Sequence, residues 1–543
     1  MQGRRLCKRS AWRQRVRQAR FLFVCALPLL GGCLPGMGWG DDERSSFSDD
    51  SEGPALNRSY KTNFLAIKVP SLGLSSLQGQ LMPDSGPAVL TAFSTTETRK
   101  PSQSGAPLGF NANPNDGAAT DPPALPPAQA LQNFYSALAA LNAGKRPQPV
   151  SIIHLSGDQI VDDRFAGALR DHLTSRFGNA GRGLMLPGLY PIRGMKVDRG
   201  GQWALASAAG DAKGPFGITG VRVTSSGNDA WLRFTSAEGP FDWLDVTFAT
   251  GPGQGTAAVS VDGDVKLVPT NAPSANQTSI RVTVKAREII IRPRGDGAIT
   301  VLSVASGTRT PGILYTNAGL PGSAAWTPEK WNPEFAANDF RKLSPALVLL
   351  GFGTRESFID DLDVKQFEAR FSRLIEQIKM WAPQASILVM GPPDAARLPS
   401  YSGTAGAQVC RALNPQETAS YAKLLEQGDE RLARWHAPPR FEGVRLAMKR
   451  AAVANGAFYW DWAKYMGGPC SIHAWTTFNP PLAAPDHVTL TEAGDDRSAR
   501  ALYAELVAGY EAYQRALAKA QTASVAPVKP APQPAKVSAK RQK

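Results

Sequence analysis

The sequence lacks the features that mark several large classes of protein. Of its 543 residues, only five are Cys and five are His. No apolar run reaches the roughly 18 residues that a membrane-spanning helix needs, which excludes an integral membrane bundle. Hydrophobic residues make up 43% and charged residues 20% of the chain, so it is not a disordered protein as a whole. Its length suggests more than one domain.

The body of the chain also lacks net charge. Residues 1–20 carry eight Lys/Arg and residues 519–543 carry six, and neither segment has an acidic residue. These fourteen cations account for the whole formal charge of +14. A neutral body gives no basic face for nucleic acid, so we expect no nucleic-acid partner.

Residues 1–33 have the form of a bacterial export signal, with a basic segment followed by a short apolar one. Residues 30–33 (Leu-Gly-Gly-Cys) resemble a lipobox, in which Cys33 becomes lipidated. Ordinary signal-peptidase cleavage nearby is the alternative. We therefore expect an exported protein, periplasmic or envelope-associated, whose contact with a membrane is limited to a lipid anchor at Cys33.

Two cysteines, Cys410 and Cys470, lie in the body of the chain. In an oxidising compartment such a pair favours one disulfide over two free thiols. Neither cysteine has the spacing of a metal site, so we expect no metal and no cofactor.

Several segments differ in composition and in the pattern of their apolar residues. Residues 34–127 are rich in Ser, Gly, Pro and Asn and predict a tether, and the basic tail at 517–543 predicts disorder. In 128–194 and 309–516, apolar strands such as 150–154, 346–350 and 386–390 alternate with amphipathic helices. This alternation predicts a parallel sheet with helices on both faces.

Residues 195–308 predict an all-β sandwich inserted into this α/β domain. Gly, Pro, Asn and Asp separate short runs of alternating polarity, at 221–224, 231–234, 244–248, 258–261, 280–284, 288–291 and 299–304. Inserts of this kind often bind glycans or shape a cleft, and a purely structural role is equally open.

Polar segments at 154–163, 351–357 and 486–494 fall at strand ends or before a helix, where α/β proteins place their chemistry. Together with 164–183, 315–322 and 466–475, they resemble the SGNH (GDSL) hydrolase superfamily. The resemblance is to its envelope branch of peptidoglycan and polysaccharide O-acetylesterases. It covers 128–194 and 309–516, and implies a three-layer α/β/α domain.

The resemblance also implies a mechanism of ester hydrolysis. In this family a Ser attacks the ester, a His takes its proton, and an Asp three residues earlier orients the His. A backbone N–H, a Gly and an Asn hold the oxyanion. The matching positions here are occupied by Asp158 (nucleophile), Gly319, Arg355 (Asn), Asp486 (orienting acid) and Thr489 (His).

Three of these positions, Asp158, Arg355 and Thr489, thus depart from the pattern. Loss of a triad nucleophile or base typically lowers the rate about a million-fold. Arg355, in the turn that begins at Gly353, still offers a fork of donors to an anion or a sugar hydroxyl, and Asp158 facing it would close the site with a salt bridge. The residues therefore fit either a decayed site refilled for stability or a glycan-binding cleft.

A shifted triad is the alternative. Ser156 and His487 each lie two residues before a family position, and residues two apart in an extended segment face the same side. Ser156 with His487, and Asp486 or Asp158 nearby, would form it if both loops slipped together. Of the other histidines, His154 matches a scaffold position, and His436 and His473 are expected in loops.

Three functions follow from these residues. The first is an envelope protein with little or no esterase activity that binds O-acylated polysaccharide or peptidoglycan, or assists proteins of polysaccharide synthesis or acetylation. The second is a working carbohydrate O-acetylesterase that uses the shifted pair. The third is an assembly scaffold whose β insert binds another envelope protein.

Overall fold

The computed structural model describes residues 121–187 and 192–525. The export segment, Cys33, most of the tether and residues 526–543 lie outside the described residues. Within these ranges, none of the helices combines the length and the apolar character needed to cross a bilayer.

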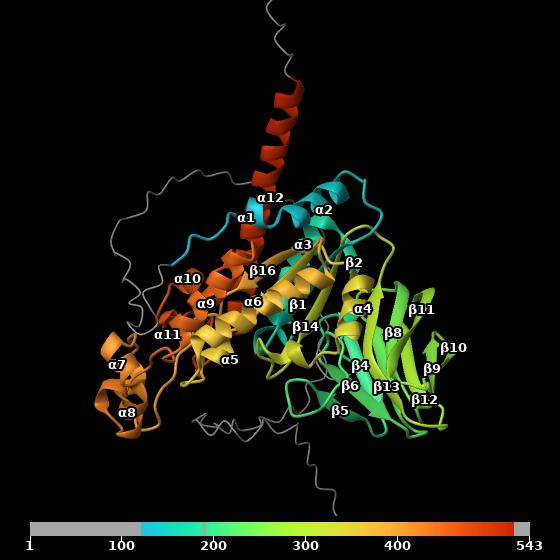
Figure 1. Ribbon diagram of the computed structural model, residues 1–543, viewed down its shortest axis with the longest axis horizontal. Coiled ribbons are helices and arrows are strands. Elements are labelled where there is room, and N and C mark those ends of the chain that lie inside the picture. The colour runs from blue at the N-terminus through green and yellow to red at the C-terminus, as the bar shows by residue number, and fades with distance from the viewer. Residues whose placement is uncertain (1–120, 188–191, 526–543) are drawn as a thin grey trace, which may run out of the picture. The chain divides into compact units, whose positions relative to one another are not determined.

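A six-stranded sheet forms the centre of the α/β part, and all of its strand pairs are parallel. Its order is β17 (Phe458–Trp460), β16 (Ser386–Met390), β15 (Leu347–Gly351), β1 (Val150–Ser156), β14 (Ile313–Gly319) and β2 (Asn179–Gly181). The predicted α/β class is confirmed (Figure 1).

Each face of this sheet is buried by its own set of helices, because alternate strand residues point to opposite sides. Ile153 and Leu155 of β1 belong to one core and Val150 and Ile152 to the other. The first core includes residues of α4 (Pro333–Leu343), α6 (Val364–Trp381) and α9 (Phe441–Ala454). The second includes residues of α2 (Gln132–Asn142), α3 (Arg164–Phe177) and α12 (Glu492–Val525). The shorter helices are α1 (Pro127–Ala130), α5 (Thr354–Ser357), α7 (Pro415–Ala419), α8 (Tyr421–Glu426), α10 (Trp462–Met466) and α11 (Ser471–Thr476).

The insert is a β-sandwich, as predicted. One sheet has the order β10 (Asp264–Pro269), β9 (Thr256–Val261), β12 (Glu288–Pro293), β7 (Trp231–Ser236) and β4 (Met195–Gly200). The other has the order β11 (Asn276–Ala286), β8 (Phe241–Thr250), β13 (Ile299–Gly307), β6 (Val221–Ser225) and β5 (Ala204–Ser207). Their facing sides share one apolar core that includes Phe234, Leu244, Val246 and Phe248.

Two details differ from the sequence prediction. β3 (Gly183–Met185), within the segment assigned to the α/β part, pairs with β13 of the sandwich. Helix α12 continues to Val525, although disorder was predicted from residue 517. The reason is composition: residues 516–521 are Ala, Leu, Lys and Gln, all strong helix formers that extend an existing helix.

Candidate active site at the carboxyl edge of the parallel sheet

Three neighbouring strands end at the same level. In the strand register, Ser156 of β1 lies opposite Gly319 of β14 and Gly351 of β15. Since these are the last residues of their strands, the loops that follow meet at one edge of the sheet. This carboxyl edge therefore gathers Asp158, Gly319 and Arg355, three of the five positions that the resemblance identifies.

The turn after β1 is fixed by hydrogen bonds at both of its candidate nucleophile positions. Ser156 is buried and its hydroxyl donates to the carbonyl of Gly351. Gly157 has no room for a side chain, because a Cβ there would lie 2.8 Å from the carbonyl oxygen of Ser323. Asp158 is exposed, and its carboxylate accepts the N–H of Gly322 at 2.8 Å. The nucleophile position thus holds an acceptor that ties two loops together.

The second oxyanion donor of the family pattern is also engaged. The N–H of Gly319 donates to Oδ1 of Asn317 at 3.0 Å. The amide of Asn317 in turn donates to a carboxylate oxygen of Asp163 at 2.9 Å. Asn317 was not predicted, and its side chain accepts the N–H that the resemblance assigns to the oxyanion.

The third block turns sharply at Gly353, which has φ 104°. Its N–H donates to the carboxylate of Glu356 at 2.9 Å, and the second oxygen of Glu356 accepts the N–H of Ala325 at 2.6 Å. Burial raises the pKa of Glu356. A Cβ on Gly322 would lie 3.4 Å from an Nη of Arg355, so this guanidinium lies beside the loop that Asp158 binds. The structure brings Asp158 and Arg355 to the same loop.

Asp486 and Thr489 form a closed pair. One oxygen of Asp486 accepts the N–H groups of Val488 and Thr489, each at 2.9 Å, and the other accepts the Thr489 hydroxyl at 2.7 Å. Asp486 therefore binds the side chain at position 489, where the resemblance implies a histidine, but that side chain is a hydroxyl. Thr489 cannot take up a proton near neutral pH as an imidazole does.

The shifted pair does not form in this structure. Nδ1 of His487 lies 2.8 Å from the carbonyl oxygen of Pro485, and its Nε2 lies 2.8 Å from Nδ1 of His473. The His487 ring stacks on Trp435 with centroids 3.6 Å apart, and burial lowers its pKa. Both ring nitrogens of His487 thus have hydrogen-bond partners, and the hydroxyl of Ser156 is hydrogen-bonded to the carbonyl of Gly351. This arrangement does not support catalysis by Ser156 and His487.

His473 corrects one prediction: it lies on α11 instead of in a loop. The structure joins Cys410 and Cys470 in the expected disulfide. Cys470 directly precedes α11, which carries His473. The backbone of Cys410 forms an isolated β-bridge with that of Trp435, whose ring stacks on His487. The disulfide therefore links the segments that contact the His473–His487 pair from two sides. His154 is a scaffold residue, since its ring lies 2.8 Å from the hydroxyl of Tyr315 and burial lowers its pKa to about 3.

A buried network of ion pairs lies next to the end of β14 and was not predicted. The side chain of Asp163 is buried and accepts from Arg170 at 3.1 Å and Arg182 at 3.4 Å. It also binds Asn317. Its own φ is 58°, a left-handed conformation that short polar residues adopt more readily than most. Among the described residues, no group of three or more His, Cys, Asp or Glu could hold a metal.

Comparisons with known proteins agree with this architecture. No protein-family model and no curated protein matches the sequence. A solved structure of a peptidoglycan O-acetylesterase matches with a TM-score of 0.57 and 20% identity, over 70% of this chain and 96% of that chain. The chain shares the fold of that structure.

Two further solved structures match with lower scores. A family two carbohydrate esterase from Cellvibrio japonicus has 11% identity over 56% of this chain and 98% of that chain, at a TM-score of 0.20. A GDSL-like lipase from Parabacteroides merdae has 14% identity over 37% of this chain and 75% of that chain, at a TM-score of 0.25. Scores this low support no argument of their own. The fold therefore rests on the first match and on the sheet topology.

Asp394, beside α11, predicts a dependence of stability on pH. It is buried and accepts the N–H of Ile472 at 3.0 Å, yet burial raises its pKa to about 7. The pKa of Asp394 is higher in the folded protein than in the unfolded chain. Its contribution to the free energy of unfolding is therefore fully present below pH about 4 and is lost as pH rises through 7. The free energy of unfolding of the wild type should fall between pH 5 and 8. In Asp394→Asn, this fall should be smaller by about 1–3 kcal/mol.

Urea unfolding at pH 5, 6, 7 and 8 measures this effect. Asp171→Asn, at an exposed position on α3, is the matched control and should keep the wild-type decline. A variant at Asp394 with the same decline as the wild type would show that the buried carboxyl does not titrate in this range.

Proposed function

We propose that this chain is an exported envelope protein of SGNH-type fold that binds O-acylated polysaccharide and hydrolyses it little or not at all. The observation that carries the proposal is the closed Asp486–Thr489 pair, in which a threonine hydroxyl occupies the place of the catalytic imidazole. The acetylesterase that shares the fold supports an O-acylated saccharide as the ligand class. Export and lipidation of Cys33 belong to the proposal, since residues 1–33 lie outside the described residues.

The carboxyl edge suits binding more than turnover. Arg355 supplies a planar fork of donors beside the Asp158–Gly322 contact, where it can engage a carboxylate or a pair of hydroxyls. The backbone donor at Gly319 is held by Asn317. A polar edge with fixed donors and without the imidazole of a triad suits holding a sugar more than activating a nucleophile.

Acetate release tests the absence of turnover. Purified protein incubated with O-acetylated peptidoglycan and acetylated polysaccharides should release acetate no faster than the Ser156→Ala variant. Release that disappears in Ser156→Ala would instead establish an esterase in which the Ser156 and His487 loops rearrange.

Binding is tested on the same glycans by co-sedimentation. Arg355→Ala should weaken binding about tenfold or more, as expected for loss of a charged hydrogen-bonding group. Arg500→Ala, an exposed arginine on α12, is the matched control and should bind like the wild type. Equal binding by Arg355→Ala would remove the carboxyl edge as the glycan site.

A further inference from the structure

A second polar site lies on the outer face of the sandwich, where β8 approaches the α/β part. Along β8, the core residues Leu244 and Val246 alternate with Trp243, Asp245 and Thr247. Since alternate residues face opposite sides, the last three form a row on the outer face. The packing of the sandwich core does not require this row.

Neighbouring strands complete the row. Arg281 of β11 lies opposite Asp245, with its Nε 3.4 Å from the carboxylate, and its guanidinium lies 4.6 Å from the centroid of the Trp243 ring. Gly307 of β13 lies opposite Trp243, and a Cβ there would come within 2.5 Å of the indole. The glycine thus leaves room for a large aromatic ring on this face.

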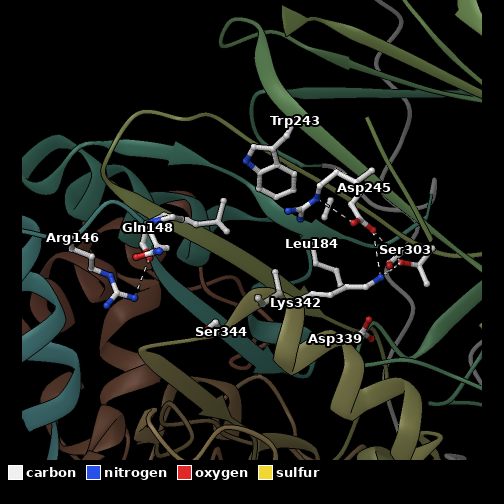
Figure 2. Close-up of a pocket in the computed structure, with 15 residues that line it drawn as sticks. Arg146, Gln148, Leu184, Trp243, Asp245, Ser303, Asp339, Lys342 and Ser344 are labelled. Atoms are coloured by element: carbon white, nitrogen blue, oxygen red, sulfur yellow. Dashed lines mark hydrogen bonds and ion pairs between the residues drawn. The ribbon is translucent and has the colours of Figure 1, made fainter. Parts of the chain in front are cut away.

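Helix α4 supplies the facing wall. Phe335, Asp339 and Lys342 are spaced four and three residues apart, so they share one side of the helix. Phe335 packs on Leu302 of the sandwich, which fixes the approach of the two parts. Lys342 reaches Thr247 at 3.2 Å and Asp245 at 3.5 Å (Figure 2).

Between these walls is a cavity of about 470 Å³, a volume typical of small-molecule sites. Arg146 and Gln148, from the loop that leads into β1, line its other end (Figure 2). The Nε of Arg146 is buried and has no hydrogen-bond partner among the described residues. This junction pocket lies at the start of β1 and β14, opposite the carboxyl edge.

The chemistry of the walls selects a class of ligand. Trp243, over whose ring the Arg281 guanidinium lies, offers apolar contact to the C–H groups of a sugar. Carboxylate lone pairs that Ile218, Arg281 and Lys342 leave unused accept hydrogen bonds from its hydroxyls. Three cations, Arg146, Arg281 and Lys342, outnumber the carboxylates of Asp245 and Asp339. The two carboxylates disfavour a compact polyanion such as phosphate, whereas the excess of cations favours a ligand with one negative charge and several hydroxyls.

We propose that the junction pocket is a saccharide-binding site that takes a sugar bearing a carboxylate, such as a hexuronate. It is separate from the carboxyl edge and does not depend on the function proposed there.

Titration calorimetry of the full chain with galacturonate tests this proposal. We expect a Kd below about 1 mM, and binding at least tenfold weaker to its methyl ester, which keeps the ring and removes the charge. Trp243→Ala and Arg281→Gln should each weaken binding at least tenfold. Arg281 is exposed, so its variant should keep the wild-type melting temperature.

The chain offers a matched control on the other sheet of the sandwich. Arg233 lies 4.9 Å from the ring centroid of Trp231, an arginine–tryptophan pair like that of the pocket, and Arg233→Gln should bind like the wild type. Absence of binding at 10 mM ligand, or equal binding by Arg281→Gln and Arg233→Gln, would overturn the site. Equal affinity for the ester, or for inorganic phosphate, would overturn the proposed ligand class.

Discussion

The triple variant Asp158→Ser, Arg355→Asn, Thr489→His should acquire ester hydrolysis at least about 100-fold above the wild-type protein. The substitutions place a hydroxyl after Gly157, an amide donor in the third block, and an imidazole three residues after Asp486. Asp486 is already positioned, since it binds both the N–H and the side chain of residue 489 at 2.9 and 2.7 Å. The expected recovery stays below that of an intact enzyme, because Asn317 holds the Gly319 donor.

The single variants Asp158→Ser and Thr489→His are the controls. A nucleophile and its base act as a unit, so each alone should stay at the wild-type rate. Release of 4-nitrophenol from its acetate and of acetate from acetylated glycans, at pH 7.5, measures the gain. A folded triple variant with the wild-type rate would mean that the backbone of the carboxyl edge, and not only its side chains, has left the catalytic geometry.

The architecture could be predicted because it depends on regular patterns. Apolar runs such as 346–350 must be buried on both faces, and the alternating runs of the insert must be buried on one. Each of the seven predicted strands of the insert lies within an observed strand, whereas β4, β5 and β10 were missed. In β10 polarity alternates only from Asp264 to Leu267, and the apolar Val265 and Leu267 are exposed, so this short run at the edge of its sheet is not marked by burial of an apolar face.

The site could be predicted only in part, for a different physical reason. The positions of Asp158, Gly319 and Asp486 come from the resemblance of short segments to a known family, and such segments can be compared in the sequence alone. The hydrogen-bond partner of Asp158, Gly322, lies far away in the sequence, so this contact depends on how two loops meet in space. The pairing of His487 with His473 and Trp435 was missed for the same reason, since these residues come from separate segments.

Loss of the buried carboxylate in Asp163→Ala should destabilise the fold by about 3–5 kcal/mol. Asp163 lies 3.1 Å from Arg170 and 3.4 Å from Arg182, and all three residues are buried. Without the carboxylate, Arg170 keeps a buried charge whose nearest alternative is Asp171 at 3.8 Å. Arg182 retains its contact with Glu238, which limits the loss.

The neighbouring residue provides the control. Asp162 is also paired with an arginine, Arg164, but both side chains are partly exposed, so Asp162→Ala should change stability by at most about 1 kcal/mol. Urea unfolding at pH 7 compares the two variants, and Asp163→Asn separates loss of charge from loss of the hydrogen-bond acceptor. Equal losses for Asp162→Ala and Asp163→Ala would show that the network is not a structural support. A large loss only at Asp163 would mean that its ion pairs stabilise the fold. Asp163 also accepts a hydrogen bond from Asn317, which in turn accepts the N–H of Gly319. The ion cluster would then support the carboxyl edge whether or not the edge carries out any chemistry.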